Sequence, residues 1–140
     1  MLLKSENSFV QITVLNRRSH NNTDYWDDNW IKSEIKINER NFNGKYNINL
    51  RTNDFQRFYL DLSNLSKGKI QEVKFTTMEE GLFLKGKLDL TGNIKWSIIA
   101  KSGEGTQLRF SMDTDNNSIK ILLIEVLKVL NEYPVVGNIG

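Results

Sequence analysis

The chemically richest stretch of the chain is DYWDDNW, residues 24–30, which holds three carboxylates, a tyrosine and two of the three tryptophans. Carboxylates this close together can bind a hard cation or divide acid and base roles between them. Aromatic rings beside them can stack on sugars or bases. The stretch therefore raises four possibilities: a metal site, a sugar-binding platform, a partner-binding patch, or a structural loop that closes one end of a sheet.

The three aspartates favour a structural or partner-binding role over a metal site. A calcium-binding loop spaces its oxygen ligands at regular odd positions, with a glycine at the sharp turn and a distant bidentate glutamate. Asp24, Asp27 and Asp28 share only their acidity with that pattern. We expect at least one of them to accept backbone N–H groups within the loop, and we expect Asp28→Ala to change stability little.

The two tryptophans of this stretch favour core packing over ligand stacking. Trp30 opens a segment of alternating polar and apolar residues, and Trp26 precedes it by one turn-length. Burying an indole stabilises a fold through its large apolar area. We therefore expect Trp26 or Trp30 to be buried at the sheet edge, while Tyr25 stays open between the two roles.

The rest of the sequence carries no recognisable catalytic or cofactor-binding motif. His20 is the only histidine and there is no cysteine, so we do not expect a zinc or two-histidine iron site within the chain. Ser19, His20 and Asp24 lack the nucleophile-elbow motif of a Ser-His-Asp hydrolase. The SGEG segment, residues 102–105, has neither the spacing nor the lysine of a phosphate loop and suits a hairpin turn. We expect no metal, no cofactor and no enzymatic activity.

Alternation with a period of two predicts most of the secondary structure as strands. The clearest case is the segment after the aromatic cluster, where four apolar or small residues alternate with polar ones. Trp96 alternates with isoleucines in the same way and is predicted to be a core residue. The predicted strands cover residues 9–15, 31–38, 45–51, 69–77, 81–90, 93–101 and 106–113.

Apolar residues at spacings of three and four predict two helices. The first covers residues 52–68, begins at Thr52 or Asn53, and ends at Gly68. The second ends at Pro134 and carries a broad apolar stripe: Ile119, Leu122, Leu123, Val126, Leu127, Leu130 and Tyr133. We expect the tail after Pro134 to be frayed.

The order β-β-β-α-β-β-β-β-α predicts one α+β domain over residues 1–140. Its antiparallel, mostly meandering sheet should have about seven strands, because parallel strands would need a crossover helix between most pairs. We expect the C-terminal amphipathic helix to pack on that sheet, against a face containing Ile35, Ile37, Ile48 and Leu50.

Composition places the chain among globular proteins without pointing to a polyanion partner or a membrane. Hydrophobic residues make up 39% and charged residues 26%, and the formal charge is +2. The charges are interspersed, so we expect no direct nucleic-acid partner. No apolar run approaches the roughly 18 residues that span a bilayer, and the start lacks a signal-peptide core. With no cysteine to form disulfides, we expect a cytoplasmic protein.

Residues 24–30 also carry a resemblance to a known family. The loop DYWDDNW, the strand IKSEIKI that follows it, the hairpin NFNGKY and the EYP segment at residues 132–134 together resemble the WapI-type immunity proteins and their small bacterial relatives. The resemblance covers most of the chain in layout, and its specific part is the seven-residue loop. Asp28 stands where the family pattern has a glycine, which puts the turn of the loop in doubt.

The resemblance implies an immunity role without catalysis. Such a protein binds the C-terminal toxin domain of a contact-dependent polymorphic toxin and keeps it inactive. The toxins are often nucleases, so carboxylates could cover a basic substrate groove. The candidate partner-binding residues are Asp24, Tyr25, Asp27, Asp28, Glu79 and Glu80, with Trp26 and Trp30 as structural loop residues. The alternative is a carbohydrate-binding or small-ligand module that uses Trp26 and Trp30.

Overall fold

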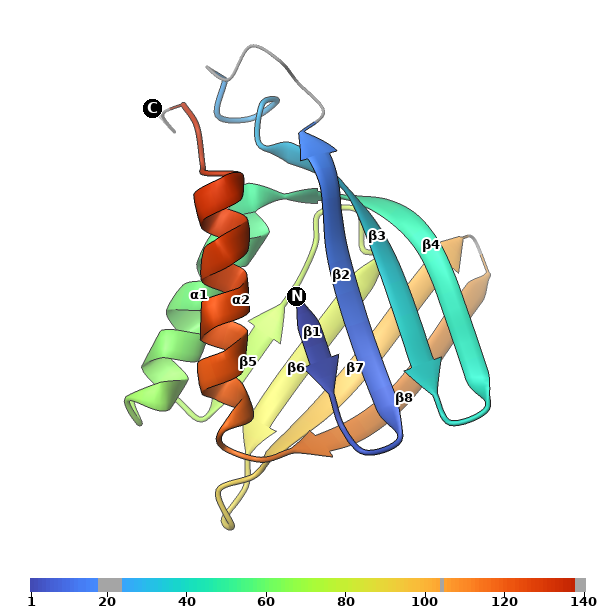
Figure 1. Ribbon diagram of the computed structural model, residues 1–140, viewed down its shortest axis with the longest axis vertical. Helices are drawn as coiled ribbons and strands as arrows, with labels where there is room; N and C mark the ends of the chain where they lie inside the picture. The colour runs from blue at the N-terminus through green and yellow to red at the C-terminus, as the bar shows by residue number, and fades with distance from the viewer. Residues whose placement is uncertain (18–23, 104, 138–140) are drawn as a thin grey trace.

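Two four-stranded antiparallel sheets, each followed by a helix, form the computed structural model, which describes residues 1–17, 24–103 and 105–137 (Figure 1). The first sheet contains β1 (Leu2–Lys4), β2 (Ser8–Arg17), β3 (Trp30–Glu39) and β4 (Phe42–Arg51) in that order, and α1 (Thr52–Ser66) follows it. The second sheet contains β5 (Glu72–Phe75), β6 (Leu82–Leu88), β7 (Ile94–Gly103) and β8 (Thr106–Thr114), and α2 (Ser118–Glu132) follows it.

The α+β class and the antiparallel meander are confirmed, but the prediction of one sheet of about seven strands is wrong. The chain forms two sheets, because α1 separates the first four strands from the last four. The additional strand is β1, whose three residues pair with β2 at Leu3 and Val10. A three-residue strand is too short to show a period of two, so the sequence pattern gave no sign of it.

The core lies where the inner faces of the two sheets meet α1. Phe58 of α1 packs edge-on against Phe75, with ring centroids 5.4 Å apart, and also against the ring of Trp96. Trp96 is fully buried, as predicted, and its Nε1–H donates to Thr114 Oγ1 at 2.9 Å. Gly86 leaves room for this ring, because a Cβ there would lie 2.7 Å from an indole carbon.

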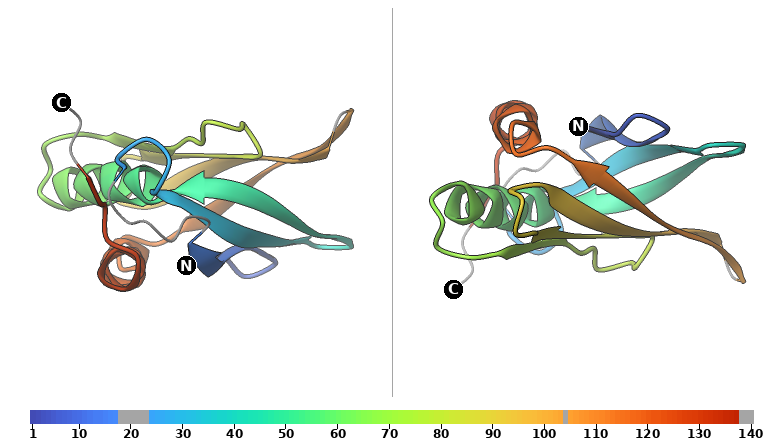
Figure 2. Two further views of the ribbon diagram at one scale, coloured as in Figure 1. Left: turned by 90° about the horizontal axis from the view of Figure 1, so that it is seen from above. Right: turned by 90° about the horizontal axis from the view of Figure 1, so that it is seen from below.

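The C-terminal helix does not pack on the sheet face that the sequence predicted for it. α2 packs against α1 and the edge strand β1, on the outside of the layer that α1 forms with the sheets (Figure 2). The backbone N–H of Leu2 donates to the Glu125 carboxylate at 3.3 Å. Because α1 and the second sheet already cover the inner face of the first sheet, α2 buries only Ile119, Leu122 and Val126 fully. Leu127, predicted to lie in the core, is 41% exposed.

The helix ends agree with the sequence signals to within two residues, since α1 ends at Ser66 and α2 at Glu132. Gly68 has φ +73°, the left-handed conformation expected after a helix. The N-cap of α1 is Arg51, one residue before the expected position, and its N–H donates to Asp54 Oδ2 at 2.9 Å. Within the described part of the chain, neither helix has the length and apolarity needed to cross a bilayer.

Candidate functional site

The loop before β3, residues 24–29, is held together by its own aspartates; we call it the DYW loop. Asp24 Oδ1 accepts the backbone N–H groups of Trp26 at 2.8 Å and Asp27 at 3.2 Å. Asp28 Oδ2 in turn accepts the backbone N–H of Asp24 at 2.7 Å. The prediction that at least one of these carboxylates accepts backbone N–H groups is confirmed.

In the DYW loop the polar residues are buried and the tryptophans are not, the opposite of what the sequence predicted. Trp26 is 56% exposed and Trp30, the first residue of β3, is half-buried, so neither indole plugs the core as predicted. The buried residues are Asp28, 2% exposed, and Asn29, which is fully buried. Asp24 and Asp27 remain exposed, and Tyr25 is half-buried.

The aromatic rings instead surround Arg51, a residue for which the sequence pattern suggested no role. Arg51 is 5% exposed, and its guanidinium carbon lies 5.5 Å from the ring centroids of Tyr25 and Trp26 and 5.7 Å from that of Trp30. Its Nη2 also donates to the Tyr25 carbonyl at 3.0 Å. Each cation–π contact of this kind is worth about 0.5–2 kcal/mol. The arginine therefore fixes the rings while leaving much of Trp26 in solvent.

The strand register could have revealed one part of this arrangement, the pairing of Arg51 with Trp30. Trp30 and Arg51 are directly opposite in the β3–β4 ladder. Residues opposite each other in an antiparallel pair project to the same face. A correct alignment of the two strands therefore places the arginine beside the tryptophan, but the neighbouring rings of the loop require the folded structure.

Asn29 ties the DYW loop to the C-terminal tail. Its Nδ2 donates to the carbonyls of Tyr25 at 2.7 Å and Val136 at 3.0 Å, and its Oδ1 accepts the Val136 N–H at 2.8 Å. Arg17 adds a second link, donating to the Asp28 carbonyl at 2.5 Å and to the Pro134 carbonyl at 2.6 Å. The expectation of a frayed tail is therefore wrong at Val136, and residues 138–140 lie outside the described part of the chain.

The other two predicted partner-binding residues lie in the β5–β6 loop, residues 76–81. Glu79 and Glu80 are exposed, and Glu80 adopts φ +56°. The loop is fixed at Gly81, whose carbonyl accepts the Tyr46 hydroxyl at 2.7 Å and the Lys101 N–H at 3.0 Å. Burial raises the pKa of the Tyr46 hydroxyl to about 12, so this donor keeps its proton.

Strand β4 connects the two acidic loops. Arg51 at its end contacts the DYW loop, and Tyr46 contacts the β5–β6 loop from the same strand. Both loops lie at the upper end of the molecule in Figure 1. Tyr46 and Arg51 are five residues apart and therefore project to opposite faces of β4, so the two loops form separate patches.

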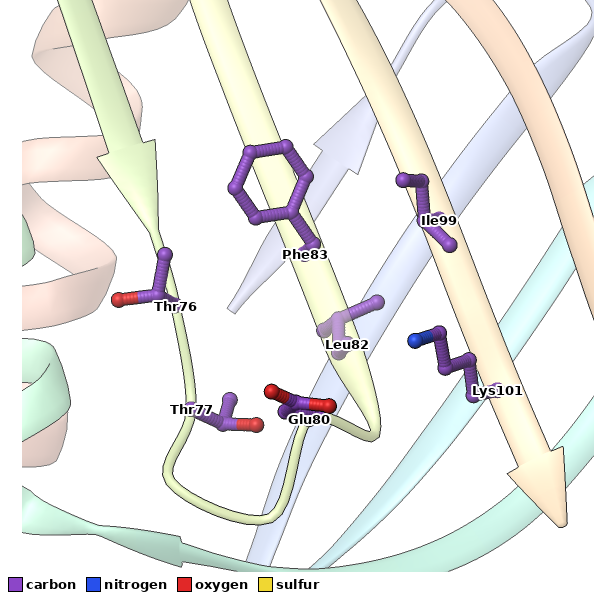
Figure 3. A pocket seen from close by; sticks show the side chains of 7 residues that line it. All are labelled: Thr76, Thr77, Glu80, Leu82, Phe83, Ile99 and Lys101. Atoms are coloured by element: carbon purple, nitrogen blue, oxygen red, sulfur yellow. The ribbon is translucent and has the colours of Figure 1, made fainter. Parts of the chain in front are cut away.

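A pocket of about 340 Å³ opens beside the β5–β6 loop, on the outer side of the second sheet (Figure 3). We call it the β6–β7 pocket. Phe83 and Ile99, which are directly opposite in the β6–β7 ladder, form its apolar part. The complete lining is Thr76, Thr77, Glu80, Leu82, Phe83, Ile99 and Lys101.

The described residues include no group of three or more His, Cys, Asp or Glu side chains arranged to hold a metal ion. Asp24 and Asp28 use their carboxylates within the loop instead. Ser19 and His20 lie outside the described residues.

Comparison with known proteins gives one family and a distant fold relationship. Residues 1–134 match the model of the immunity protein WapI-like family. No curated protein matches the chain. The Trypanosoma brucei MRP1/MRP2 crystal structures align with a TM-score of 0.52 at 11% identity, covering 91% of this chain and 76% of that chain. At that identity the likeness shows a shared fold alone.

A second solved structure, a guide-RNA-binding protein complex bound to a guide RNA, aligns less well. Its TM-score is 0.46 at 10% identity, covering 87% of this chain and 89% of that chain. This similarity is too low to support an argument about the present chain.

Proposed function

The chain belongs to the immunity protein WapI-like family, and from that membership we propose that it binds a toxin domain and holds it inactive. The match over residues 1–134 is the observation that carries the proposal. The protein acts by occupying a surface of the toxin and catalyses no reaction itself. Because the chain has no cysteine and needs no oxidising compartment to fold, we propose that this binding takes place in the cytoplasm.

The exposed carboxylates of the two acidic loops are the proposed contact residues. Asp24 and Asp27 of the DYW loop are exposed, as are Glu79 and Glu80 of the β5–β6 loop. A negatively charged surface favours a basic patch on the partner and increases the association rate. We propose that these residues cover a basic groove of the toxin, with the half-buried Tyr25 at the edge of the contact. Asp28, 2% exposed, supports the loop from behind.

Co-expression tests the function directly. The test needs the gene neighbourhood first: an open reading frame immediately upstream that encodes a secreted protein would supply its C-terminal domain as the toxin. We expect its expression alone to arrest growth and co-expression of this chain to restore it. Titration calorimetry with an inactivated toxin domain should show a stable complex. Growth arrest that persists with this chain present, together with no heat of binding, would overturn the proposal.

Charge reversal tests the contact surface. We expect Asp27→Lys and Glu79→Lys each to slow association, and the loss should shrink as salt screens the charges. Asp113→Lys is a matched control, because Asp113 is an exposed carboxylate at the end of β8, next to the start of α2. Equal association rates for all three variants would place the toxin on a different surface.

The exposed Trp26 keeps one second function open, a carbohydrate or small-ligand site. Trp26 is 56% exposed, although Arg51 lies against its ring and those of Tyr25 and Trp30. A bound sugar ring stacked on this indole should change tryptophan emission. Emission that stays constant across a broad glycan panel would remove this function.

A further inference from the structure

We propose that the β6–β7 pocket is the anchor point of the toxin complex: it receives one large apolar side chain of the toxin, next to a basic residue that pairs with Glu80. This inference rests on the proposed function and adds the recognition chemistry. Anchors of this kind, an aromatic or aliphatic side chain in a pocket, dominate the energetics of protein interfaces.

The apolar part of the pocket departs from the pattern of its own sheet. Along β7 the inner positions are apolar, and the outer positions are Lys95, Ser97, Ile99 and Lys101. Ile99 is thus the one apolar outer residue of that run, and Phe83 lies directly opposite it on β6. Both side chains are half-buried and lie outside the core. The pair forms a small apolar spot on an otherwise polar face, the kind of place that an interface anchor residue can occupy.

The loop that forms the pocket wall holds a conformation that costs stability. Glu80 has φ +56°, a left-handed conformation that is unfavourable for a residue other than glycine, asparagine or aspartate. Such backbone strain persists only where the surrounding structure holds it in place. Here Gly81 provides that hold, through the two hydrogen bonds to its carbonyl from Tyr46 and Lys101.

The polar groups of the pocket define what an occupant must present. Glu80 and Lys101 extend toward the pocket from the loop and from β7 (Figure 3), and no ion pair joins them in the described chain. The enclosed Thr77 Oγ1 also has no hydrogen-bond partner there. A toxin lysine or arginine can pair with Glu80, and a toxin backbone carbonyl can accept from Lys101. The volume of about 340 Å³ can hold an indole or phenyl side chain between them.

The β5–β6 loop beside the pocket and the DYW loop both contact strand β4, at Tyr46 and Arg51. The five-residue step along β4 from Tyr46 to Arg51 corresponds to about 17 Å of strand. Because this step is an odd number of residues, Tyr46 and Arg51 project to opposite faces of β4, so the anchor proposal concerns the pocket and the β5–β6 loop alone.

The first test fills the pocket. Thr76 is an exposed residue of the lining, so Thr76→Trp places an indole in the space that the toxin side chain needs. We expect the dissociation constant for the inactivated toxin domain that co-expression identifies to rise at least about tenfold. Thr13→Trp, at an exposed position on β2 in the other sheet, is the control and should bind like the wild type.

The second test separates binding from stability. Glu80→Gly removes the carboxylate and also relieves the left-handed strain, so we expect stability to be kept or raised while toxin binding weakens about tenfold. Arg40→Gly is the matched control, because Arg40 has the same φ of +56° but lies in the turn between β3 and β4. It should gain stability without losing affinity.

The outcomes distinguish failure of the anchor proposal from failure of the proposed immunity function. If the wild-type chain binds the toxin and both Thr76→Trp and Glu80→Gly bind with unchanged affinity, the pocket is not the anchor and the immunity function stands. If the wild-type chain does not bind this toxin or protect against it, the proposed function fails, and the anchor fails with it.

Discussion

At the scale of single residues, buried polar groups hold the DYW loop more firmly than its tryptophans do. Asp28 and Asn29 are buried and bind backbone groups, whereas Trp26 is largely exposed. A buried polar side chain that satisfies backbone groups leaves them unsatisfied when it is removed, at a cost of about 1–3 kcal/mol. The stability of the loop therefore depends on its amide and carboxylate groups.

Asp28→Ala is the direct test of this arrangement. We expect a loss of about 1–3 kcal/mol of unfolding free energy, because the change removes a buried carboxylate and the charge-assisted hydrogen bond that it accepts from the Asp24 N–H. This reverses the small effect that the sequence suggested. Asp27→Ala is the matched control, since Asp27 is exposed and only its backbone N–H is bonded; it should change stability by less than about 0.5 kcal/mol. Equal urea midpoints for the two variants would show that the Asp28 carboxylate does not stabilise the DYW loop.

A second residue-scale prediction concerns pH. Burial raises the pKa of the Asp54 carboxyl above its ordinary 3.8, although bonds and charges from Arg51 and Arg57 act in the opposite direction. The folded state therefore holds this proton more tightly than the unfolded state does. Its contribution to stability is complete below pH 3.8 and is lost as the pH rises through the higher folded pKa.

Comparison with Asp54→Asn isolates this carboxyl, because asparagine does not titrate. We expect the unfolding free energy of the wild type, minus that of the variant, to fall as the pH rises from below 3.8 toward neutrality. Urea unfolding at a series of pH values measures it. A difference that grows with pH would mean that the ion pair with Arg57 outweighs burial.

The residues that sequence reasoning placed correctly are those whose environment is local. Trp96 follows from the alternation along its own strand. The tryptophans of the DYW loop do not, because their surroundings depend on Arg51, which follows Tyr25 by 26 residues, and on a tail that Asn29 reaches across 107 residues. Periodicity reports which face a residue occupies, and it contains no information about such distant partners.

At the scale of elements, alternation located the long strands, and apolar spacing located both helices. The apolar stripe of α2 nevertheless overestimated its burial. Of the predicted stripe, Leu127 is 41% exposed, and Leu123, Leu130 and Tyr133 are only half-buried. A helix pattern predicts an apolar face, but the width of the buried part is set by the element that covers it. Here α1 and the short strand β1 cover only part of the stripe.

Two leucines of α2 differ in burial, so alanine substitutions at them show which part of the helix is covered. Leu122 is 1% exposed, so we expect Leu122→Ala to cost about 2–5 kcal/mol through lost burial and the remaining cavity. Leu127 lies on the same helix and is 41% exposed, so Leu127→Ala should cost less than about 1 kcal/mol. Thermal or urea unfolding compares them. Equal losses would show that α2 is covered on its outer side as well.

At the scale of the whole molecule, the two sheets meet at a second place besides the core. Tyr46 of the first sheet donates to Gly81 at the start of β6, and Ile48 of the same strand packs against that glycine. The β5–β6 loop, which carries Glu79 and Glu80, is thus positioned by the opposite sheet. Sequence patterns describe each sheet separately, so this contact could not be predicted from them.

The contact between Ile48 and Gly81 gives a test of how the sheets hold the loop. A Cβ at Gly81 would lie 2.8 Å from the Ile48 Cγ2 methyl, which is closer than real Cβ contacts. We expect Gly81→Ala to destabilise the protein by about 1–3 kcal/mol, because either the loop or the isoleucine must move. Gly44→Ala is the control, since a Cβ at Gly44 meets no atom within 4 Å. Urea unfolding of both variants measures the difference.

A double-mutant cycle then assigns the cost to this one contact. Ile48→Ala removes the Cγ2 methyl and lowers stability by itself through lost packing. In that background the added cost of Gly81→Ala should fall below about 1 kcal/mol, because the clash is gone, so the two changes should be clearly non-additive. Additive losses would mean that Gly81 is required for a reason other than Ile48, and that the β5–β6 loop is set by its own backbone rather than by the opposite sheet.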